Sequence, residues 1–175
     1  MPNPMYDILQ RLPLEPGTYA LILFCQEGRN IRVGQLGVMR LQSGFYVYVG
    51  SALGPGGLRG RIAHHIRQAK RPRWHIDYLR THARVDQVWY CCDALRREHR
   101  WAHALETAQG GSIPLYGFGA SDCNCASHLY FFDSCPSRRK FERWLRSCNR
   151  EKRLVSGIPP RPRQLMRLRD CLKSI

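Results

Sequence analysis

The chain has 175 residues, 43% of them hydrophobic, and a formal net charge of +15. This hydrophobic fraction excludes an intrinsically disordered chain, and no apolar run reaches the roughly 20 residues that a membrane-spanning helix needs. The first residues show no basic-then-apolar signal pattern. We therefore expect a cytoplasmic protein that contacts no membrane.

The positive charge is concentrated towards the C-terminal end. Residues 136–175 hold 13 Lys/Arg and 3 Asp/Glu, against 15 and 10 in residues 1–135. Such a basic segment favours a polyanionic partner, and DNA is the partner we expect. Genomic base composition is the alternative source of the charge, because 24 of the 28 basic residues are arginine. We expect one domain over residues 1–150 and a basic Pro/Arg-rich tail over residues 151–175.

Apolar runs rich in β-branched and aromatic residues predict strands in the first half of the chain, and apolar residues at every fourth position predict a helix. We expect strands over residues 18–25, 31–41 (with bulges at Gly34 and Gly37) and 45–49, then a helix over residues 58–70. The second half is predicted to hold helices over residues 74–79, 95–109 and 137–150, strands over 85–91 and 128–132, and a short basic helix over the last ten residues.

Four side chains of the first half are suited to act on a phosphate. Tyr19 and Tyr48 lie on the first and third predicted strands, and they approach each other if these strands pair. Arg61 offers planar charged donors to phosphate, and His65, one helical turn later, can transfer protons near neutral pH. A tyrosine activates water only if neighbouring cations lower its pKa of about 10. Taken singly, each residue is more simply a packing or surface residue.

Glu98, on the predicted helix over residues 95–109, is the carboxylate best placed in the sequence to hold one hard divalent cation such as Mg²⁺. Its neighbours Arg96, Arg97 and Arg100 offer the simpler alternative of an ion pair.

The eight cysteines suggest either disulfides or a metal site, and the lack of a signal pattern disfavours disulfides. Cys123, Cys125 and His128 form one compact cluster with three soft ligands. No second ligand pair nearby completes a zinc site. A structural loop is therefore the favoured interpretation, and a zinc-stabilised interaction domain remains the alternative.

The order and spacing of these residues resemble the GIY-YIG nuclease superfamily. The matching motifs are Gly17-Thr18-Tyr19, Tyr48-Val49-Gly50, Leu58-Arg59-Gly60-Arg61 followed by His65, and Glu98. Residues 44–52, 74–79 and 117–129 narrow the resemblance to one branch, whose members occur alone or fused to endonuclease III-type DNA repair glycosylases. The resemblance extends from about residue 14 to residue 133.

The resemblance implies a compact α/β (α+β) domain, with a small central antiparallel three-stranded sheet flanked by helices, here with added strands and a C-terminal helix. It also implies a DNA endonuclease with a single Mg²⁺ or Mn²⁺ ion, with roles in DNA repair and a repair glycosylase or other repair protein as partner. Tyr19 would be the general base or its relay, and Tyr48 would support the nucleophilic water. Arg61 would stabilise phosphate, His65 would share the proton transfer, and Glu98 would hold the metal.

The chain departs from the superfamily pattern in two ways. Tyr19 and Tyr48 are 29 residues apart, a wide spacing that predicts an inserted or lengthened strand over residues 31–41. Ser51 stands where many members carry lysine, and Arg59 is a candidate replacement for that cation. The expected nucleic-acid contacts are Ser51, Arg59, Arg67 and Lys70. A catalytically inactive nucleic-acid-binding module with the same fold is the alternative function.

Overall fold

The computed structural model describes residues 9–67, 71–108, 110–156 and 173–174. Six strands form one antiparallel sheet in the order β6-β7-β4-β1-β5-β8, and β2 pairs with β3 in a separate hairpin. The strands are β1 (Gly17–Cys25), β2 (Arg29–Val33), β3 (Gly37–Leu41), β4 (Gly44–Ala52), β5 (Ala83–Cys92), β6 (Gly111–Ser112), β7 (Leu129–Phe132) and β8 (Lys173–Ser174).

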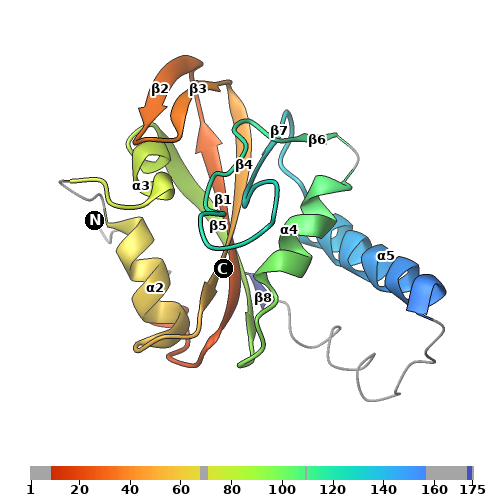
Figure 1. The fold of residues 1–175 in the computed structure, drawn as a ribbon. Helices are drawn as coiled ribbons and strands as arrows, with labels where there is room; N and C mark the ends of the chain where they lie inside the picture. The colour runs from red at the N-terminus through yellow and green to blue at the C-terminus, as the bar shows by residue number, and fades with distance from the viewer. Residues whose placement is uncertain (1–8, 68–70, 109, 157–172, 175) are drawn as a thin grey trace.

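Helices cover both faces of this sheet (Figure 1). The helices α2 (Gly57–Ile66) and α3 (His75–Arg80) lie on one face, and α4 (Glu98–Glu106) and α5 (Arg138–Ser156) lie on the other. Strand β1 lies at the centre of the sheet between β4 and β5, and helices cover both faces there, so its side chains are mostly buried on both faces (Figure 1). Leu21 and Leu23 belong to the core on the α2 side, whereas Ala20 and Ile22 belong to the core on the α4 side. This double burial explains why β1 is almost continuously apolar instead of alternating.

The prediction of a mixed α/β domain with an antiparallel sheet is confirmed. The sheet has six strands, because the short strands β6, β7 and β8 extend the three long strands β4, β1 and β5 on both sides. Helix α4 begins at Glu98, three residues later than predicted. The preceding residues form a turn, in which the Asp93 carboxylate accepts a hydrogen bond from Leu95 N–H and pairs with Arg97.

The predicted single strand over residues 31–41 is wrong, because the segment folds into the β2–β3 hairpin. Gly34 has φ 49° and Gly37 has φ 112°, so both take left-handed backbone conformations that reverse the chain between the strands. The Leu36 N–H donates to the Val33 carbonyl at 2.9 Å inside this turn. The wide spacing between Tyr19 and Tyr48 therefore reflects an inserted hairpin.

The predicted boundary at residue 150 falls inside α5, which continues to Ser156. Residues 151–156 are therefore helical, while residues 157–172 lie outside the described chain. Lys173–Ser174 form β8 against Trp89 and Tyr90, and not the end of a basic helix. None of the helices in the described ranges is long and apolar enough to cross a membrane.

Candidate active site

A cavity of about 340 Å³ lies on the α2 side of the sheet, where β1 begins and β4 ends. All five residues predicted as catalytic line it, and they come from β1, β4, α2 and α4. These residues are Tyr19, Tyr48, Arg61, His65 and Glu98. The cavity is also lined by residues that the sequence did not single out for catalysis, among them Arg73, Trp74, His75, Arg96, Ser121 and Asp122.

Tyr19 and His65 form the centre of this site. The Tyr19 hydroxyl oxygen lies 2.7 Å from His65 Nε2, and the two residues are only 1% and 2% exposed. Gly50 faces Tyr19 from the neighbouring strand β4. A Cβ atom at Gly50 would lie 2.4 Å from the Tyr19 hydroxyl oxygen, so the glycine makes room for the phenol.

Burial keeps both members of this pair uncharged. Burial and, after it, the nearby Tyr48 raise the pKa of Tyr19 well above its usual value of 10. Burial and, after it, the Arg61 guanidinium lower the pKa of His65 to about 3. Burial also raises the pKa of Tyr48 to about 12. Arg61 lowers the pKa of both tyrosines, but desolvation raises it more, so the condition for a tyrosine to activate water is not met in the protein alone.

Arg80 holds the end of α2 in place. The residue is only 5% exposed, and its guanidinium donates to the His65 carbonyl at 3.1 Å, the Ile66 carbonyl at 3.2 Å and the Ala83 carbonyl. A cation at this position satisfies the last carbonyls of the helix and matches the helix dipole. Arg80 thereby positions His65, a role that the sequence alone did not indicate.

Glu98 begins α4 and is 4% exposed. Its Oε1 atom lies 3.6 Å from Arg96 Nη1 and 3.7 Å from His99 Nε2. Among the described residues, Glu98 Oε2 is buried without a hydrogen-bond partner. An unpaired buried carboxylate oxygen is costly in the absence of a cation, so the Oε2 atom suits a divalent metal ion.

The four predicted nucleic-acid contacts have different environments. Ser51 lines the cavity. Arg59 instead donates to the Leu12 carbonyl at 2.7 Å and the Gln10 carbonyl at 3.3 Å, so it fastens the N-terminal segment onto α2. Arg67 is exposed directly after α2. Lys70 lies outside the described residues.

Trp74 forms a partly exposed wall of the cavity. Its side chain is 38% exposed, and the Arg61 guanidinium carbon lies 4.7 Å from the centre of its ring system. The same indole packs against the His65 ring, with ring centres 5.1 Å apart. Asp77 fixes the turn before α3 by accepting hydrogen bonds from the Arg73 and Trp74 N–H groups at 2.9 and 3.0 Å.

The loop between β6 and β7 closes another side of the cavity. Gly119 has φ 71° and donates its N–H to His75 Nδ1 at 2.9 Å. A Cβ atom at Gly119 would lie 2.9 Å from Tyr48 Cε2, so the loop backbone packs directly on the second tyrosine. The His128 N–H donates to the Phe118 carbonyl at 2.7 Å, which folds the loop back on itself.

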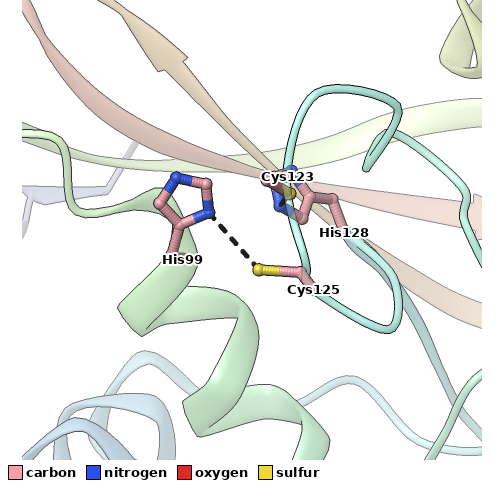
Figure 2. Close-up of side chains that lie close together, drawn as sticks. All are labelled: His99, Cys123, Cys125 and His128. Atoms are coloured by element: carbon pink, nitrogen blue, oxygen red, sulfur yellow. Dashed lines mark hydrogen bonds between the residues drawn. The ribbon is translucent and has the colours of Figure 1, made fainter.

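A cluster of two cysteines and two histidines lies beside this loop (Figure 2). One potential ligand atom from each of His99, Cys123, Cys125 and His128 lies within 4.8 Å of the others. His99 Nδ1 is 3.3 Å from Cys125 Sγ, and His128 Nε2 is 3.4 Å from Cys123 Sγ. The sequence had indicated three of these residues. It missed His99, because this histidine lies on α4, 24 residues before Cys123.

No curated protein and no solved structure matches the chain. Residues 18–150 match the family model described as domain of unknown function DUF123. The matched range contains the five residues predicted as catalytic and the Cys/His cluster. The chain therefore belongs to the DUF123 family.

Proposed function

We propose that the protein is a metal-dependent DNA endonuclease that hydrolyses phosphodiester bonds in DNA repair or processing. The observation that carries this proposal is the meeting of Tyr19, Tyr48, Arg61, His65 and Glu98 around one cavity. If these residues only packed the core, we would expect them at separate places in it, since they come from four different elements. The resemblance of their motifs to the GIY-YIG nuclease superfamily also supports this proposal.

A single Mg²⁺ or Mn²⁺ ion is the cofactor we propose, with Glu98 as its protein ligand. The unpaired Glu98 Oε2 atom supports this assignment, because a hard cation would compensate its burial. Mg²⁺ commonly binds through one or two carboxylates and keeps several waters. When bound, the ion would polarise a phosphoryl oxygen and stabilise the charge of the transition state.

The remaining residues supply proton transfer and charge neutralisation. Tyr19 and His65 share one short hydrogen bond, through which they would share the proton transfer once bound DNA and metal change the charges around the cavity. Arg61 brings a permanent positive charge to the cavity wall, where it can neutralise a phosphate oxygen. Tyr48 lies beside His65, with ring centres 5.8 Å apart, and can orient a water on that side.

The rim of the cavity suits DNA. Arg61, Arg73 and Arg96 all line it, and cations of this kind bind the phosphate backbone. The exposed ring of Trp74 offers a flat surface on which a base released from the duplex can stack. The cavity walls therefore combine phosphate contacts with a stacking platform.

The deciding experiment incubates the full chain with plasmid, branched DNA and RNA substrates, with and without Mg²⁺ or Mn²⁺. Glu98→Gln should reduce the cleavage rate by at least about 100-fold, because it removes the anionic metal ligand. DNA affinity should stay within about twofold, since the change removes no positive charge. Glu106→Gln is the matched control, since Glu106 is a half-exposed residue at the other end of α4. It should cleave like the wild type.

Binding without cleavage of any substrate in either metal would reject the nuclease. That result would favour the noncatalytic nucleic-acid-binding module. Equal loss of cleavage in the Glu98 and Glu106 variants would reject Glu98 as a specific metal ligand.

A further inference from the structure

We propose that His99, Cys123, Cys125 and His128 bind one structural zinc ion, which fastens the loop between β6 and β7 to the first turn of α4. This site is separate from the Mg²⁺ site proposed at Glu98, and it does not depend on nuclease activity. Figure 2 shows the four side chains directed towards a common centre, His99 from α4 and the other three from the loop and its end.

The distances match a tetrahedral zinc site. Zn–S bonds of about 2.3 Å and Zn–N bonds of about 2.0–2.1 Å place neighbouring ligand atoms about 3.3–3.8 Å apart. The two nitrogen–sulfur distances of 3.3 and 3.4 Å fit this range closely. The largest separation between ligand atoms is within 4.8 Å, so a small side-chain rotation closes the tetrahedron.

The chemistry of the ligands selects zinc over magnesium. Thiolate and imidazole groups in a Cys₂His₂ set are typical ligands of Zn²⁺, whereas Mg²⁺ requires oxygen ligands. Both thiols are free, because neither Cys123 nor Cys125 forms a disulfide. Cys91, by contrast, is disulfide-bonded, so the expectation that disulfides are disfavoured is wrong for that residue.

Four protein ligands leave no position for substrate or water, which is typical of a structural zinc site and not a catalytic one. The ion would fix the part of the loop over residues 121–126, in which no side chain is buried. Asp122, Cys123 and Cys125 are exposed or only partly buried, and the loop residues from 113 to 126 form no helix or strand. A metal anchored to α4 gives such a segment a fixed position.

The zinc site would also position the candidate active site. His99 would bind the metal through Nδ1, while its other ring nitrogen, Nε2, faces Glu98 Oε1 at 3.7 Å. Such a pairing of a ligating histidine with a carboxylate is common around zinc and orients both groups. His128, the ligand at the loop end, lines the same cavity as Glu98. Loss of zinc should therefore displace both Glu98 and Asp122.

The test measures metal content in the full chain without a histidine tag, purified after brief exposure to a weak chelator. We expect about one zinc per chain by elemental analysis. Replacement by Co²⁺ should give the visible bands of tetrahedral cobalt and the near-ultraviolet bands of cobalt–thiolate bonds. Excess Mg²⁺ should not displace either metal. Removal of zinc with a strong chelator should lower the melting temperature, and returned zinc should restore it.

Variants then locate the site. His99→Asn and Cys125→Ser should each reduce retained zinc at least about tenfold and weaken or abolish the cobalt–thiolate bands. The matched controls are His103→Asn, one turn further along α4, and Cys135→Ser, an exposed thiol outside the cluster. Both controls should keep one zinc. Because His99 is partly exposed, with 41% of its side chain accessible, its variant should fold.

A folded wild-type chain that holds neither zinc nor tetrahedral Co²⁺ would overturn the proposal. Equal metal loss in the control variants would overturn the assignment of these four ligands. Neither outcome depends on cleavage of a substrate. The zinc proposal can therefore be wrong while the nuclease proposal is right, and the nuclease proposal can be wrong while the zinc proposal is right.

Discussion

The Tyr19 hydroxyl oxygen and His65 Nε2 lie 2.7 Å apart although 46 residues separate them in the chain. Three features bring them together. Strand β1 points Tyr19 towards α2, Gly50 leaves space for the phenol, and Arg80 fixes the end of α2 that carries the histidine. Among the described residues, His65 Nδ1 has no hydrogen-bond partner, so Tyr19 provides the contact that this ring makes through Nε2.

Tyr19→Phe tests whether this hydrogen bond serves the reaction. The variant keeps the buried ring but removes the hydroxyl, so His65 loses its partner. We expect cleavage of the best DNA substrate to fall at least about 100-fold, because a proton relay is lost. The free energy of unfolding should fall by about 1–2 kcal/mol, the cost of an unsatisfied buried group.

Tyr116→Phe is the control for that change, because Tyr116 is 70% exposed. It should match the wild type in stability and in cleavage. A Tyr19→Phe protein that cleaves at the wild-type rate would exclude the phenol from the reaction, whatever its stability.

Gly50→Ala tests the space beside Tyr19. The added methyl group would lie 2.4 Å from the Tyr19 hydroxyl oxygen, so the phenol or the strand must move. We expect a loss of about 1–3 kcal/mol in the free energy of unfolding and a parallel loss of cleavage. Denaturant unfolding and a nuclease assay measure these effects.

Gly54→Ala supplies the comparison, since nothing lies within 4 Å of a Cβ atom at Gly54. It should change stability by less than about 0.5 kcal/mol. If both alanine variants behaved alike, the close approach of Gly50 to Tyr19 would have no energetic role.

The protonation of His65 should make the fold sensitive to acid. Its folded-state pKa is lowered to about 3, mainly by burial and then by Arg61. His64 and Arg80 lower this pKa further, and only Asp77 raises it. The unfolded chain, with a histidine pKa of about 6.5, binds the proton first as the pH falls. This histidine should therefore lower stability progressively from about pH 6.5 towards pH 3.

Nuclear magnetic resonance of the ring can follow this titration directly. In the folded protein at about pH 5, His65 should still show the chemical shifts of neutral imidazole. A peptide spanning residues 60–70 gives the unfolded reference, with a midpoint near about 6.5. A midpoint above about 5.5 in the folded protein would contradict the buried, neutral histidine.

The main strands and the pairing of the tyrosines could be predicted because they depend on local patterns. The apolar run of β1 and the glycine that ends the apolar part of β4 are visible in the sequence, and Arg61 and His65 are one helical turn apart. The β2–β3 hairpin was missed because a glycine with positive φ serves a bulge and a turn equally well.

The other parts of the site depend on contacts between distant segments. His99 joins the Cys/His cluster only because α4 packs beside the loop that carries Cys123. In the sequence, Arg80 is one of many basic residues. The packing of α3 on α2 is what makes it a buried donor to three carbonyls. The spacing of residues along the chain does not indicate such contacts.

Arg80→Lys measures what that buried guanidinium contributes. A lysine keeps the charge, but its compact ammonium cannot follow the planar fork that reaches the carbonyls of His65, Ile66 and Ala83. Leaving carbonyls unsatisfied should lower the free energy of unfolding by about 2–4 kcal/mol. Urea unfolding measures the loss.

The matched control is Arg84→Lys, because the Arg84 side chain is 70% exposed and its ion pair with Asp86 spans 3.9 Å. That exchange should cost less than about 0.5 kcal/mol, as expected for a surface pair. In Arg80→Lys the end of α2 should also loosen, so the Tyr19–His65 hydrogen bond should exchange its proton faster with solvent than in the control. Equal stability of the two lysine variants would show that the α2 carbonyls find other donors, and that Arg80 does not position His65.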